Sequence, residues 1–102
     1  MKRTVSILCA VLALWQAPAS AADQKTTAQR LAANCANCHG TNGRTVNGTL
    51  PPLAGQPAGA IVAALKEFKA GTRQATIMHQ IAKGYTDEQI EAIAAYLAAR
   101  KQ

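Results

Sequence analysis

Hydrophobic and polar residues follow one another along the chain in patterns that predict helices. A largely apolar run fills residues 5–15. Apolar residues then recur at helical spacing, weakly over residues 27–35 and clearly over residues 57–69 and 86–101. After the leading run, the pattern therefore predicts an all-α fold of three to four short helices.

The last of these stripes is the clearest helix signal. Thr86, followed three residues later by Gln89, fits the capping box that begins many helices. Ile90, Ile93 and Leu97 then recur on one face, which we expect to be buried. The sequence therefore predicts a terminal helix that begins after Thr86, and it also predicts which face of this helix is buried.

The middle stripe predicts a second helix, and a loop comes before it. Ile61, Leu65 and Phe68 recur at intervals of four and three residues, and Gly71 lies just past the predicted end. Residues 40–56 contain four glycines and a Pro-Pro pair, which oppose regular structure. A loop this long in a small domain is usually functional.

The leading apolar run has the features of a secretory signal peptide. A positively charged pair precedes the run, Pro18 ends it, and small residues then suit cleavage before Ala22. The run is too short for a membrane span, which needs about 20 apolar residues. We therefore expect residues 1–21 to be removed on export. Residues 22–102 should then form one periplasmic domain with no membrane span.

Removal of the leader changes the composition. The full chain has a net charge of +6, whereas residues 22–102 hold nine basic and five acidic residues, two of the three cysteines, and no tryptophan. Alanine is abundant there and buries little area per residue. So small a domain usually needs a disulfide, a metal or a cofactor, and this one is short of bulky core residues. Export also excludes nucleic acid as a partner.

The two remaining cysteines lie in "CANCHG", where His39 directly follows Cys38. A Cys35–Cys38 disulfide would close a tiny loop and constrain the unfolded chain little. A structural zinc site needs four ligands, and only His79 remains to complete a set. The sequence C-x-x-C-H is the attachment motif of c-type haem. We therefore predict one covalently attached haem c, with Cys35 and Cys38 in thioether bonds and His39 on the iron.

A haem held in this way needs a second axial ligand from elsewhere in the chain. Met78, the only methionine after the leader, and the adjacent His79 are the candidates. A methionine sulfur raises the reduction potential relative to a second imidazole. A proline carbonyl in the loop could accept the proton on the free nitrogen of His39. With both axial positions filled the iron can only exchange electrons, so we expect no catalysis by this chain alone.

The order of four segments resembles the class I cytochromes c. These are "CANCHG", "PPLAGQ", "LKEFKAGTR" and "TIMHQIAKGYTDEQIEAIAAYLA", which together cover most of residues 22–102. The order is similar to that in single domains of cytochrome c4. The last segment is similar to the cytochrome subunit of flavocytochrome c sulfide dehydrogenase, a family in which some members have two haem domains. The resemblance implies the class I fold around one haem, with Met78 as the distal ligand and Pro51 as the acceptor from His39.

Two functions are consistent with this resemblance. The first is the haem subunit of a sulfide dehydrogenase, which would accept electrons from a sulfide-oxidising flavoprotein. The alternative is a free diffusible cytochrome that carries electrons between respiratory or photosynthetic complexes. The partner in either case is another redox protein. A domain without haem, whose two cysteines form a disulfide, is a third possibility.

Overall fold

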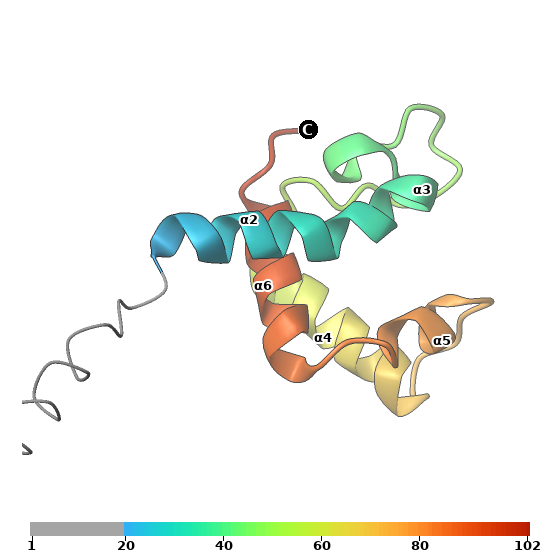
Figure 1. Ribbon diagram of the computed structural model, residues 1–102. Helices are drawn as coiled ribbons and strands as arrows, with labels where there is room; N and C mark the ends of the chain where they lie inside the picture. Colours follow the sequence, from blue (N-terminus) through green and yellow to red (C-terminus); the bar gives the residue numbers. More distant parts are fainter. Residues whose placement is uncertain (1–19) are drawn as a thin grey trace, which may run out of the picture.

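The computed structural model describes residues 20–102, so nearly all of the predicted leader, residues 1–21, lies outside the described residues. Three helices of 12 or 13 residues form the frame, two shorter helices and two 3-10 turns connect them, and no strand occurs in the described part (Figure 1). The predicted all-α fold is confirmed. The elements are α2 (Ala21–Ala32), η2 (Ala33–Cys35), α3 (Ala36–His39), η3 (Thr41–Gly43), α4 (Ala58–Ala70), α5 (Met78–Ala82) and α6 (Asp87–Ala98).

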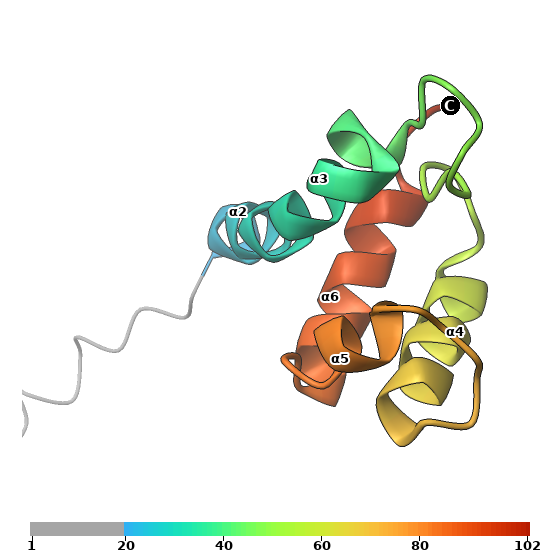
Figure 2. The ribbon, with the colours of Figure 1, turned by 90° about the vertical axis from the view of Figure 1, so that its right-hand side faces the viewer.

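Helix α6 is the centre of the arrangement. It packs against both α2 and α4, and α5 packs against α4. Figure 2 shows α6 between α2 and α4, with α3 and the C-terminus at one end of the molecule and α5 at the other. The buried face of α6 is Ile90, Ile93, Ala94, Tyr96 and Leu97. This face includes all three residues predicted from the spacing.

The start of α6 has the predicted capping box. The hydroxyl oxygen of Thr86 accepts a hydrogen bond from the Gln89 backbone N–H at 3.2 Å, and the Thr86 N–H donates to Gln89 Oε1 at 2.9 Å. These bonds satisfy two backbone donors at the two ends of the first turn. Asp87, the first helical residue, also accepts a bond of 2.9 Å from Lys69 Nζ on α4. The cap therefore fixes where α6 begins, and the Lys69–Asp87 pair links this end of the helix to α4.

Helix α2 corrects the sequence-based prediction. The helix begins at Ala21, six residues before the predicted start at Thr27. Asp23 lies in the first turn, where a carboxylate interacts favourably with the positive end of the helix. The buried residues of this helix are Ala28 and Ala32, and such small side chains give only a weak hydrophobic pattern. The predicted cleavage before Ala22 falls within the first turn and remains a prediction.

The loop and α4 follow the predicted plan with small differences. Within the predicted loop of residues 40–56, only the 3-10 turn η3 is regular. Helix α4 begins at Ala58, one residue after the start of the predicted range, with Pro57 as its N-cap, and it ends where Gly71 adopts a φ of 77°. In the part of the chain from residue 20 onward, no helix has the length and apolar character needed to cross a membrane.

Candidate functional site

A cavity of about 430 Å³ lies between the inner face of α6, helices α4 and α5, and the α3 segment with its following loop. Cys35, Cys38 and His39 line one side, and Met78 enters from α5. The volume is within the range of ordinary ligand pockets. Most of the remaining walls are apolar. They include Leu53, Ile61, Leu65, Phe68, Ile93 and Leu97.

Two short helical segments position the cysteines. Cys35 ends η2 and Cys38 lies in α3, so their side chains are three residues apart on a continuous helical path and share a face. Cys35 is half-buried, Cys38 is exposed, and the two are not joined in a disulfide. Burial raises the pKa of the Cys35 thiol above its ordinary value. Both sulfurs are therefore free to react with a group placed in the cavity.

His39 ends α3 and is buried, with only 9% of its surface exposed. Its Nδ1 lies 2.8 Å from the carbonyl oxygen of Pro51, a hydrogen-bond distance. A carbonyl can only accept, so Nδ1 carries the proton and donates it to Pro51. In the neutral ring, the other nitrogen, Nε2, is then the one with a free lone pair that can ligate a metal. Pro51 also lines the cavity, so the structure brings together the two residues that the resemblance had paired.

The two candidates for the second ligand are placed differently. Met78 is the first residue of α5, is half-buried and lines the cavity. His79 follows it directly and is not among the lining residues. Its Nδ1 is buried without a hydrogen-bond partner within residues 20–102. Met78 therefore lines the same cavity as the cysteine motif, whereas the imidazole of His79 does not.

Sequence reasoning missed the apolar residues at the exposed part of the cavity. Leu50, Ile77 and Ile81 line it and keep 40%, 55% and 37% of their surface exposed. They belong to a loop and to a five-residue helix with its N-cap, where no periodic pattern can form. The signal that could have identified two of them is the apolar residues on both sides of Met78 in "TIMHQI".

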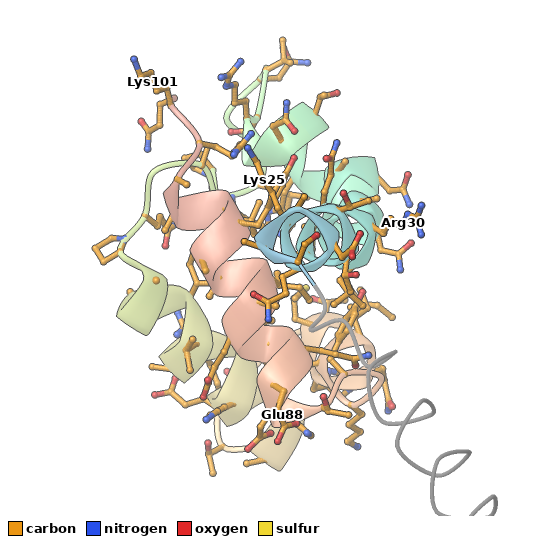
Figure 3. The ribbon with its side chains drawn as sticks, turned by 60° about the vertical axis from the view of Figure 1, so that its left-hand side comes forward. Lys25, Arg30, Glu88 and Lys101 are labelled. Carbon is orange, nitrogen blue, oxygen red and sulfur yellow. The ribbon has the colours of Figure 1, made fainter. Side chains whose placement is uncertain are left out.

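Charged side chains are distributed unequally over the molecule. All four ion pairs of the described residues join α4 and its following residues to carboxylates, as in Lys69–Asp87 at 2.9 Å and Arg73–Glu67 at 3.3 Å. Figure 3 shows Lys25, Arg30 and Lys101 around α2 and the chain end, and Glu88 at the opposite end of α6. These three basic residues make none of the four pairs, so positive charge without an ion pair lies near α2 and the chain end.

These residues fit a c-type haem. Two free thiols share one helical face at the cavity, a buried imidazole has its Nδ1 proton held by a carbonyl, and a methionine lines the same space. Apolar walls suit the large flat ring.

Comparison with known proteins agrees with this fit. The cytochrome c family profile matches residues 25–101. The chain is 44% identical over 66 residues to the cytochrome subunit of sulfide dehydrogenase from Chlorobaculum tepidum, covering 65% of this chain and 59% of that protein. It is 39% identical over 67 residues to the thiosulfate dehydrogenase electron acceptor of Stutzerimonas stutzeri, covering 63% and 31%. The structure of Acidithiobacillus ferrooxidans cytochrome c4 superposes with a TM-score of 0.64 and 38% identity, covering 76% and 48%.

The chain thus spans about three fifths of the length of the first of these relatives and about a third of the second. The family profile itself extends over most of the chain, from the second turn of α2 to the residue after Arg100. The motif that attaches haem and the cavity around it both lie within the matched residues. The chain therefore belongs to the cytochrome c family and is an electron-transfer domain with covalently bound haem c.

Proposed function

We propose that Cys35 and Cys38 hold the haem through thioether bonds and that His39 and Met78 are its axial ligands. The observation that carries this assignment is the shared cavity, which is lined by all four side chains. The hydrogen bond from His39 to Pro51 supports it, because a metal-bound histidine usually donates its second ring N–H to an acceptor. The absence of His79 from the cavity lining favours Met78 as the second ligand.

Each residue has a distinct part in electron transfer. When bound, haem supplies a one-electron couple between ferric and ferrous iron. Pro51 keeps the proton on Nδ1 of His39, which fixes the tautomer and raises the basicity of Nε2. The sulfur of Met78 favours the reduced state. The apolar walls exclude water, and this also tunes the potential.

We further propose that residues 22–102 are exported and form one periplasmic domain. This domain is the haem subunit that accepts electrons from a sulfide-oxidising flavoprotein. Its similarity to a sulfide dehydrogenase subunit supports this. The exposed Leu50, Ile77 and Ile81 at the cavity offer apolar area for a lasting contact with a partner.

A diffusible carrier is the second candidate. The observation in its favour is the concentration of basic side chains without ion pairs near α2, which would steer the protein to acidic surfaces. Its similarity to a thiosulfate dehydrogenase electron acceptor agrees with this function. A carrier should react with its partner at a rate that falls steeply with ionic strength, whereas a stable subunit should not.

The first experiment tests the ligands. The absorption spectrum of the exported protein is recorded in both oxidation states, and the protein is then denatured and extracted. We expect haem to stay attached and the methionine-to-ferric charge-transfer band to disappear in Met78→Ala. His79→Ala is the matched control and should retain the band. A wild-type protein with attached haem but without this band, or a protein without attached haem, would refute the proposed ligation.

The second experiment distinguishes the two functions. The tagged protein is purified from its native periplasm at low and high salt. A flavoprotein that remains in fixed ratio at both salt concentrations supports the subunit. A protein that elutes alone, and whose reduction by periplasmic partners slows with salt, supports the carrier. Ile77→Ser should weaken the first association because it removes an exposed apolar side chain at the cavity.

A further inference from the structure

Tyr96 makes a hydrogen bond that the electron-transfer assignment does not use. Its hydroxyl donates to Asn42 Oδ1 at 2.8 Å, across 54 residues of sequence. The tyrosine lies on the buried face of α6 with 8% of its surface exposed. Asn42 lies in η3, three residues after His39. The bond therefore joins the central helix to the turn that follows the haem-attachment motif.

The backbone of this turn needs support. Asn42 has a φ of 56° and is the one residue other than glycine with a positive φ between residues 20 and 102. The left-handed region costs an ordinary residue roughly 1–2 kcal/mol, although asparagine tolerates it better than most. Gly40 and Gly43, on either side, also have positive φ values of 82° and 77°. Such a conformation persists when tertiary contacts hold it.

The same turn is bonded to the loop that contains Pro51. The carbonyl of Gly43 accepts hydrogen bonds from the backbone N–H groups of Leu53 at 2.8 Å and Ala54 at 3.1 Å. The N–H of Gly55 donates to the carbonyl of Leu97 at 3.1 Å. The turn and the proline loop are thus attached to successive residues of α6. The His39–Pro51 bond spans the gap between these two segments.

We infer that Tyr96 is a positioning residue for the haem ligand His39. Through Asn42, its hydroxyl holds the turn where the Pro51 carbonyl keeps the proton on His39 Nδ1. This inference rests on the proposed role of His39 as an axial ligand. Without the hydroxyl, the turn can shift and the His39–Pro51 bond weakens. The imidazole then becomes a less basic ligand, which favours the reduced haem.

The test is the reduction equilibrium of haem-loaded Tyr96→Phe. This change removes only the hydroxyl and retains the ring, on which the Arg100 guanidinium is stacked 4.4 Å from the centroid. At a fixed solution potential, we expect the ratio of reduced to oxidised haem to rise about two- to threefold. This is at the low end of the change in an equilibrium constant that the loss of one hydrogen bond produces. Asn42→Gly should give a similar rise, since glycine accepts the positive φ. The double variant should shift the ratio no further than either single change.

Tyr85→Phe is the matched control. The Tyr85 hydroxyl contacts the Leu31 carbonyl at 3.4 Å and Asn34 Nδ2 at 3.3 Å, and it makes no bond to the turn or the proline loop. We expect its ratio to equal that of the wild type even if the variant unfolds more easily. An unchanged ratio in folded Tyr96→Phe and Asn42→Gly would overturn the positioning role while the wild-type spectrum still supports the ligands. A wild-type spectrum without a histidine-ligated haem would overturn both.

Discussion

Gly40 offers a sharp test of how closely the chain packs behind the haem-attachment motif. It directly follows His39 and has φ 82° and ψ 161°, a region open almost only to glycine. A Cβ atom placed there would lie 1.8 Å from the carbonyl oxygen of Arg44 and 2.5 Å from its carbon. Both are backbone atoms, so no side-chain rotation can relieve the overlap. The perturbation is Gly40→Ala.

The magnitude has two parts. The disallowed backbone conformation costs about 1–3 kcal/mol. To restore an ordinary contact of about 3.4 Å, Arg44 would have to move by about 1.6 Å, and forced repacking of this kind costs a further 1–3 kcal/mol or so. The expected loss of about 2–6 kcal/mol is a large fraction of the roughly 5–15 kcal/mol by which a domain is stable.

Gly48→Ala is the matched control. Gly48 also has a positive φ, 65°, but an added Cβ would meet nothing within 4 Å. The left-handed conformation costs about 1–2 kcal/mol, and the stiffer unfolded chain offsets about 0.4–1 kcal/mol of it. We expect a net loss of about 1 kcal/mol. The difference between the two variants isolates the collision with Arg44.

The assay is urea unfolding of the haem-loaded proteins, with attached haem per chain measured in parallel. If the slope of the unfolding free energy against urea concentration is the same in the variants, a change in the urea midpoint reports a change in stability. We expect Gly48→Ala to load fully, with a slightly lower midpoint, and Gly40→Ala to load poorly and to unfold at much lower urea. Equal midpoints and equal haem content for the two variants would refute the close packing of the turn.

Three further changes test the helices that frame the site. Thr86→Ala should lower the free energy of unfolding by about 1 kcal/mol through loss of the capping box, whereas Thr86→Ser should match the wild type in the same urea titration. The hydrogen bond from Lys69 lowers the pKa of Asp87 in the folded protein. The ionised carboxylate therefore stabilises the fold above the ordinary carboxyl pKa, and this stabilisation is lost as pH falls through the pKa of Asp87 in the folded state. Asp87→Asn should therefore have a lower urea midpoint than the wild type at neutral pH and an equal one in acid; a constant difference would contradict this. Ile93→Ala should cost about 2–5 kcal/mol in thermal unfolding, since Ile93 is 1% exposed and lines the cavity; a loss below about 1 kcal/mol would show that the bound group fills the space.

Much of this protein could be read from contiguous sequence. The capping box at Thr86, the buried face of α6 and the end of α4 near Gly71 agree with the structure. Each depends on residues within a few positions of one another, where backbone geometry fixes which side chains share a face. The haem-attachment motif is equally local, because its chemistry needs two cysteines and a histidine at one spacing.

Other features depended on contacts between distant segments. Helix α2 packs on α6 through Ala28 and Ala32, whose small side chains leave little trace in a hydrophobic pattern, and its first residues, 21–27, are exposed and add no apolar signal. Met78 and His79 are adjacent in sequence, and only the packing of α5 places the first in the cavity lining. The Tyr96–Asn42 bond crosses 54 residues. Local spacing cannot encode such pairs, because the free energy that selects them comes from burial and hydrogen bonding between elements that meet only when the chain has folded.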